Sequence, residues 1–223
     1  MRAIAEKGGE PFWTVSSTSV TVRAKPTRPN QTAVGGACMP YLKSHSGNSG
    51  PGDVFGAYPE IYRHWAEMGQ LLINGPSPLS PGEREMIQAL VAGSIDCQYA
   101  YVAHTAAAVA RGIAPGVVEK LVADVATAPI DAKLRPLLAF VKKLAAAPHS
   151  IGQVDADAVF AAGWDERAFH DAVALTARMT FMSRIIFGHG FVPMTPERAT
   201  ANAEHRAKVG YVALYPDLEK KKP

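Results

Sequence analysis

The chain has 223 residues, of which 48% are hydrophobic and 19% are charged, so it can bury a substantial core and is not expected to be disordered. Its net charge is only +3, and the densest basic run is Lys220-Lys221-Lys222 near the C-terminus, which argues against nucleic-acid binding. The two cysteines, Cys38 and Cys97, are too sparse for a disulfide framework, and no segment approaches the roughly 18 apolar residues of a membrane span. Without an apolar leader at the N-terminus, the sequence predicts a soluble, cytoplasmic protein with no membrane contact.

Residues 1–58 differ in composition from the rest of the chain. A short β-prone stretch, residues 14–22, runs into a segment rich in Pro, Gly, Asn and Ser, which has few ways to build a core of its own. We interpret residues 1–58 as an extended N-terminal arm that lies on the domain or on a neighbouring subunit. A partly disordered leader is the alternative.

From Pro59 onward the apolar residues follow a helical period, which predicts a helical domain over residues 59–223. The best-marked helix start is Ser80, with Pro81 at the first helical position and Glu83 three residues after the cap, the pattern of a capping box. Further helices are expected at about 97–111, 115–125, 131–146, 155–162, 165–187 and 195–208. Pro136 lacks a backbone donor, so the helix that contains it should start late or kink. The expected fold class is therefore all-α.

Four residues of the expected helix 97–111 share one stripe, because Cys97, Ala100, Tyr101 and His104 are spaced i, i+3, i+4 and i+7. They are expected to face one pocket. Cys97 falls in the first helical turn, where the helix dipole favours a thiolate, and is therefore a candidate nucleophile.

Glu85 lies on the preceding helix. It shares a face there with Ala89 and Ala92, small residues that let two helices approach closely. This arrangement predicts that the Glu85 carboxylate lies near His104 as an acid/base pair.

These positions carry a family resemblance. Glu85, then Cys97 twelve residues later, then Tyr99 and His104 match a motif of alkylhydroperoxidase D-like and carboxymuconolactone decarboxylase proteins, and the resemblance extends over about residues 59–191. It implies a helical bundle, a homo-oligomer, and a glutamate and a histidine that relay protons to a pair of cysteines. This chain departs from the motif at Ala100, which stands where the family has the second cysteine, the one that attacks peroxide.

Other interpretations of the same residues stay open. His104 is alternatively a core histidine, and Cys97 an inert buried thiol. Glu85 is alternatively a structural carboxylate that pairs with Arg84, Arg111 or a backbone donor. A metal site is not expected, because Cys97 and His104 are two helical turns apart and first-shell ligands must converge on one ion.

Four residues are candidate substrate contacts in addition to Ala100. Tyr99 and Tyr101 are expected as pocket walls. Arg184 is a candidate for orienting a carboxylate of the substrate or of Glu85. His189 either borders the pocket or serves only as the C-terminal end of its helix.

Three functions follow from these features. The leading one is acid/base chemistry without a cofactor on a small organic acid, lactone or related carbonyl compound, with Glu85, Cys97 and His104 in the active site. The first alternative is a one-cysteine hydroperoxide reductase that uses an external thiol. The second is a catalytically inactive ligand-binding scaffold.

Overall fold

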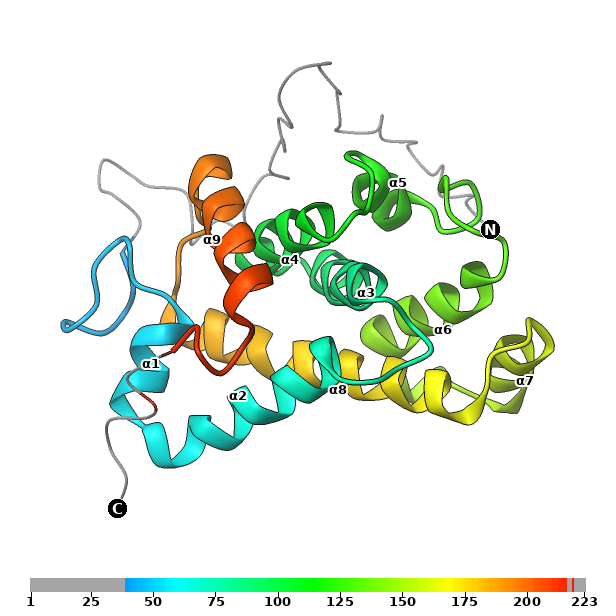
Figure 1. Cartoon of the computed structure of the whole chain (residues 1–223), viewed down its shortest axis with the longest axis horizontal. Helices are drawn as coiled ribbons and strands as arrows, with labels where there is room; N and C mark the ends of the chain where they lie inside the picture. The colour runs from blue at the N-terminus through cyan, green and yellow to red at the C-terminus, as the bar shows by residue number, and fades with distance from the viewer. Residues whose placement is uncertain (1–38, 216–217, 219–223) are drawn as a thin grey trace, which may run out of the picture.

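The computed structural model describes residues 39–215 and residue 218 (Figure 1). Every regular element in this part of the chain is a helix, which confirms the predicted all-α class. The α-helices are α1 (Pro51–Ala57), α2 (Pro59–Asn74), α3 (Pro81–Ser94), α4 (Gln98–Ala110), α5 (Val117–Ala123), α6 (Leu134–Ala146), α7 (Gln153–Ala161), α8 (Glu166–His189) and α9 (Pro196–Val209). None of these described helices is both long and apolar enough to cross a membrane.

Helices α3 and α4 form an antiparallel pair near the centre of the molecule (Figure 1). At one end of the pair the amide of Cys97 donates to the carbonyl of Ala92 at 2.8 Å. At the other end Arg111 Nε lies 3.6 Å from Oε1 of Glu85, so the start of α3 lies beside the end of α4. The pair and its close approach were predicted from the alanines of both helices.

The start of α3 is the predicted capping box. The amide of Glu83 donates to Ser80 Oγ at 3.2 Å, and the amide of Ser80 donates to Glu83 Oε2 at 2.7 Å. These two bonds satisfy donors that the first helical turn leaves without partners. The register of α3, and with it the direction of Glu85, is therefore fixed locally.

The long helix α8 packs against α2, α3 and α6 and closes the core from one side (Figure 1). Its buried residues include Leu175, Met179, Met182 and Ile186, which recur with the helical period. Arg178 is on the same buried side. Helix α9 packs on α4. Residues of α1 and of α9, which lie near opposite ends of the described chain, line one cavity.

The structure differs from the predicted helices at the N-terminal side. Helix α1 lies inside the segment that was expected to be an irregular arm, and its Val54 and Phe55 are buried in the core. Residues 1–38 of the predicted arm lie outside the described residues. Pro136 occupies the third position of α6. Backbone N–H groups in the first turn have no acceptor within the helix, so a proline there costs no helical hydrogen bond. The helix starts late, as predicted.

Candidate active site

A cavity of about 650 Å³ lies between α4, α8, α9 and the segment around α1. Three of the predicted site residues, Tyr99, Ala100 and His104, line it. The remaining wall is contributed mainly by residues that sequence reasoning did not select: Asn48, Gly50, Pro51, Gly52, Asp53, Phe55, Gly56, Trp65, Ala103, Arg178, Met182, Ile186, Met194, Arg198, Asn202, Arg206, Tyr211, Leu214, Tyr215 and Leu218.

Glu85 and His104 form the predicted pair at the wall of this cavity. His104 Nδ1 lies 2.7 Å from Oε2 of Glu85, and the two side chains come from the facing helices α3 and α4. Glu85 is fully buried, whereas His104 is 7% exposed and lines the cavity. The predicted proximity of the carboxylate and the imidazole is thereby confirmed.

The environment sets the charge of each partner. Burial by itself would raise the pKa of Glu85, but the hydrogen bond from His104 and the charges around it, including Arg206 and Arg111, lower that pKa to about 2. Burial lowers the pKa of His104, and it outweighs the opposing effect of Glu85. At neutral pH the pair is therefore a carboxylate and an uncharged imidazole.

This charge state defines the tautomer of His104. A carboxylate can only accept hydrogen bonds, so the ring proton resides on Nδ1 and points to Glu85. Nε2 is then left with its lone pair and is the ring nitrogen available to the cavity. Such an arrangement is that of a general base held in place by a carboxylate.

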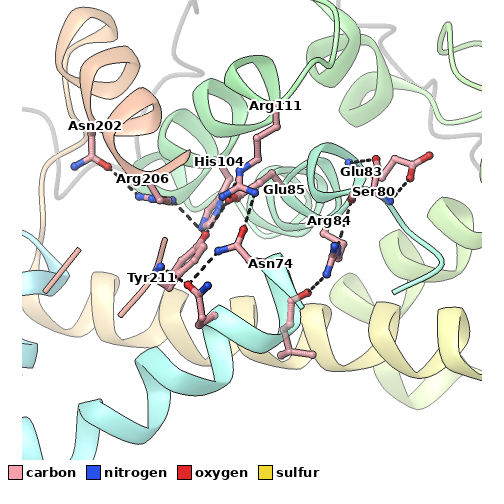
Figure 2. Close-up of polar contacts among 12 residues, drawn as sticks. Asn74, Ser80, Glu83, Arg84, Glu85, His104, Arg111, Asn202, Arg206 and Tyr211 are labelled. Carbon is pink, nitrogen blue, oxygen red and sulfur yellow. Dashed lines mark hydrogen bonds and ion pairs between the residues drawn. The ribbon is translucent and has the colours of Figure 1, made fainter. Parts of the chain in front are cut away.

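A second group of polar side chains holds the other oxygen of Glu85 (Figure 2). The hydroxyl of Tyr211 donates to Oε1 of Glu85 at 3.0 Å, and Arg206 Nη1 donates to the Tyr211 oxygen at 3.4 Å. Arg206 Nη2 in turn donates to Oδ1 of Asn202 at 3.1 Å. Glu85 is therefore bonded from α4 on one side and from the end of α9 on the other.

The backbone after α9 explains how Tyr211 reaches Glu85. Gly210 ends the helix with φ of 78°, a conformation that favours glycine, and the chain turns back toward α2. The amide of Tyr211 donates to Oε1 of Gln70 at 2.7 Å. A side chain at Gly210 would collide with the same Gln70 oxygen.

The prediction for Cys97 is partly wrong. Cys97 is the residue before the first turn of α4, is fully buried, and does not line the cavity. Burial raises the pKa of its thiol to about 11, so it is a neutral thiol rather than the expected thiolate. Desolvation outweighs the helix dipole here.

Tyr101, Arg184 and His189 also lie outside the cavity wall. Tyr101 is buried on the side of α4 that faces Gly93 and Val122 of the neighbouring helices. Arg184 is exposed, and its Nη1 donates to the carbonyl of Thr180 on its own helix. His189 Nδ1 lies 2.8 Å from the carbonyl of Ile185, which agrees with the helix-end interpretation of this residue.

The stripe on α4 was thus assigned too widely. A helix turns about 100° per residue, so one face of α4 directs Tyr99, Ala100 and His104 to the cavity while Cys97 and Tyr101 face the α3 and α5 side. The spacing that put them together on one face could not decide which edge of the stripe meets the cavity.

Arg84 and Arg111, the alternative partners of Glu85, have different roles. Arg84 Nη1 donates to the carbonyls of Leu72 and Gly75 at the end of α2. Arg111 Nη1 donates to Asn74 Oδ1 at 2.7 Å and its Nε lies 3.6 Å from Glu85. Arg111 therefore contributes positive charge near Glu85, whereas His104 contributes a hydrogen bond.

Among the described residues, no group of three or more His, Cys, Asp or Glu side chains is placed to hold a metal ion.

Comparison with known proteins agrees with this architecture. Residues 59–143, which carry Glu85 and His104, match the model of the Carboxymuconolactone decarboxylase family. The helices that hold the pair therefore lie in the segment that is similar to that family, whereas Arg178, Arg206 and Tyr211 lie beyond the matched segment.

Two solved structures are similar in fold. One is an uncharacterized peroxidase-related protein from Ralstonia eutropha JMP134, described as an alkylhydroperoxidase AhpD core, with a TM-score of 0.61 and 24% identity over 68% of this chain and 78% of that chain. The other is an uncharacterized peroxidase-related protein from Silicibacter sp. TM1040, with a TM-score of 0.55 and 27% identity over 66% of this chain and 88% of that chain. No curated protein matches the chain. The predicted alkylhydroperoxidase D-like fold is confirmed.

Proposed function

We propose that the protein is an acid/base enzyme of the carboxymuconolactone decarboxylase type that acts on a small organic acid, lactone or related carbonyl compound. The observation that carries this proposal is the 2.7 Å contact between His104 Nδ1 and Glu85 at the wall of a cavity of about 650 Å³. The uncharged imidazole is a base, and the buried carboxylate stabilises the cation formed when the base takes a proton.

The chemistry follows from these two groups. His104 Nε2 accepts a proton from the carbon next to a carbonyl group, and the electron pair of the broken C–H bond moves to the carbonyl oxygen as an enolate. Where a C=C bond is conjugated with the enolate, return of the proton from Nε2 to the far carbon of this dienolate shifts the double bond and gives an isomer. In a decarboxylation, His104 first takes up a proton from the carboxylic acid group of the substrate or from water. Loss of CO₂ from the resulting carboxylate then leaves the same kind of enolate, and the protonated His104 returns that proton to carbon.

The surrounding residues support these steps without taking part in proton transfer. Tyr211 and Arg206 keep Glu85 in place as the imidazolium forms. Arg178 and Arg206 line the cavity, and their positive charge favours an enolate over the neutral ground state. Both arginines are at least nine-tenths buried, which strengthens this electrostatic effect.

The proposal is tested by turnover of a panel of β-keto acids, unsaturated acids and lactones by the wild type, Glu85→Gln and His104→Ala. We expect each substitution to lower kcat by about 10²- to 10⁴-fold. His189→Ala is the matched control, because His189 lies outside the cavity wall. Turnover that survives in both active-site variants would contradict the proposal.

A one-cysteine hydroperoxide reductase is the second candidate, and the peroxidase-related names of the two similar structures favour it. The environment of Cys97 argues against a peroxidase, because the thiol is buried and its pKa is raised to about 11. Consumption of hydroperoxide with dithiothreitol as the external thiol, lost in Cys97→Ser, would support this function. Absence of consumption would discard it.

Two further proposals have other grounds. The family resemblance implies a homo-oligomer, which light scattering of the purified full chain tests, and the sparse cysteines favour the cytoplasm. An inactive ligand-binding scaffold is the other, and it is discarded by any turnover that both Glu85→Gln and His104→Ala abolish.

A further inference from the structure

Arg178 is a buried cation that forms no ion pair with any described residue. It is 6% exposed and lines the cavity, yet it forms no hydrogen bond or ion pair with any residue in the described part of the chain, and its Nε is buried without a partner. Its guanidinium packs over the rings of Trp65 and Tyr211, with centroids at 4.6 and 5.0 Å. A buried arginine is normally paired. No described residue supplies the partner, and the cavity that Arg178 lines has room for an anionic ligand to do so.

The carboxylates near the cavity do not fill this role, because both are already engaged. Glu85 accepts hydrogen bonds from His104 and Tyr211. Asp53 Oδ2 accepts from the amide of Gly50 at 2.7 Å, at the start of α1. The cavity wall therefore has more cations than anions, since it includes Arg178, Arg198 and Arg206 but only Asp53 with negative charge.

The guanidinium of Arg178 is enclosed by Gly69, Trp65 and Tyr211. Helix α2 passes it at Gly69, where an added Cβ would lie 2.6 Å from Nη2 and 3.2 Å from Cζ. Only a residue without a side chain lets α2 approach this closely. The rings of Trp65 and Tyr211 also restrict its movement. A planar guanidinium recognises a carboxylate by two parallel hydrogen bonds.

The rest of the cavity is suited to an apolar body. Phe55, Trp65, Met182, Ile186, Met194 and Leu214 all line it. A volume of about 650 Å³ falls within the roughly 300–1,000 Å³ of pockets that enclose ligands larger than a few carbon atoms. A ligand with one charged end and a ring-sized apolar part would satisfy both the arginine and these side chains.

We propose that Arg178 binds the carboxylate of the substrate and that the substrate class is a carboxylic acid with an apolar, ring-sized body. This inference rests on the proposed function and names the substrate class of that site. In the bound state the carboxylate lies against Arg178, and the apolar body lies between Trp65 and Met182. His104 reaches the body of the ligand from α4.

The test is titration calorimetry of the full chain with phenylacetate, 2-phenylethanol and succinate. Phenylacetate has the charge and the apolar body, 2-phenylethanol lacks the charge, and succinate lacks the apolar body. Phenylacetate is expected to bind, and loss of one partner of a buried charge contact should weaken binding by about 30-fold or more in Arg178→Met. Arg184→Met, which removes an exposed arginine of the same helix, is expected to bind like the wild type.

Two further variants keep the test decisive. Arg178→Lys, which keeps the positive charge, replaces Arg178→Met in the test if the latter fails to fold. It is expected to bind phenylacetate more weakly than the wild type because lysine lacks the planar guanidinium. His104→Ala is expected to keep phenylacetate binding while losing turnover, so the inference and the proposed function fail separately. The inference is overturned by no binding of phenylacetate at millimolar concentration, by equal binding to wild type and Arg178→Met, or by preference for succinate or 2-phenylethanol.

Discussion

The hydroxyl of Tyr211 lies 3.0 Å from Oε1 of Glu85, although 126 positions separate the two residues in the chain. Glu85 comes from the segment that matches the family model, and Tyr211 follows α9, outside that segment. A residue near the end of the described chain therefore completes the environment of a carboxylate that a helix of the matched segment carries.

Removal of this hydroxyl should destabilise the protein. Tyr211→Phe leaves Oε1 of a fully buried carboxylate short of a donor, so we expect a loss of about 1–3 kcal/mol in the free energy of unfolding. Urea denaturation at neutral pH measures it. Tyr215→Phe is the matched control, because Tyr215 lines the same cavity without bonding to Glu85, and an equal loss in both variants would contradict the assignment.

Stability should fall as the solution is acidified, in two stages. His104 has a folded-state pKa below its ordinary 6.5. As the pH falls through 6.5, the unfolded state therefore binds a proton at this residue while the folded state does not, and the free energy of unfolding decreases. Glu85 has a folded-state pKa of about 2 against an ordinary 4.5, so its contribution is present above 4.5 and is lost as the pH falls toward 2.

The two stages are separated by variants. In His104→Asn the loss that begins near 6.5 should be smaller than in the wild type, whereas in Glu85→Gln the loss below 4.5 should be smaller. Unfolding free energies from urea melts across this pH range provide the measurement. Identical pH slopes in all three proteins would show that the pair does not have the assigned charges.

Cys97 should be inert in the folded protein. With Cys38 replaced by serine, the remaining thiol is buried and has a pKa of about 11, so we expect no reaction with a thiol reagent at neutral pH until urea unfolds the chain. Mass spectrometry after timed labelling records this. Rapid labelling of the folded Cys38→Ser protein would restore Cys97 as a candidate nucleophile.

Ala100→Cys should place a reactive thiol in the cavity. Ala100 lines the cavity on the same side of α4 as His104, and it occupies the position where the family resemblance implies the attacking cysteine. We expect this variant to be labelled in the folded state and to consume hydroperoxide in the presence of dithiothreitol. Ala107→Cys, a buried position of α4 outside the cavity wall, serves as the control and should do neither.

The pairing of Glu85 with His104 could be predicted because it depends mainly on local sequence. A capping box fixes the start of α3, small residues allow α4 to approach, and one short turn joins the two helices. Spacing along consecutive helices is then enough to bring a carboxylate and an imidazole together.

Arg178 and Tyr211 could not be found in this way, because their positions depend on how α8 and α9 pack onto α4. Arg184 was selected on α8 instead, but six positions rotate a residue by about 120° around the helix, and only Arg178 faces the cavity. A signal was present, since Arg178 shares the apolar period of Leu175, Met179 and Met182, and a charge on a buried stripe indicates a site.

Helix α1 and the state of Cys97 were missed for other reasons. Seven residues that begin with Pro51 and Gly52 are too short for a helical period to stand out in a segment rich in Gly and Pro. For Cys97, the helix dipole could be read from the sequence, but the extent of burial, which reverses the expected pKa shift, depends on packing that the sequence does not show.

The ¹⁵N chemical shifts of the His104 ring in the full chain at neutral pH test the role of His104 most directly. We expect an uncharged imidazole with its proton on Nδ1 and an unprotonated Nε2, and Glu85→Gln should disturb this state while His189→Ala should not. An imidazolium at neutral pH, or a proton on Nε2 with Nδ1 unprotonated, would contradict the assignment of His104 as the base that faces the cavity.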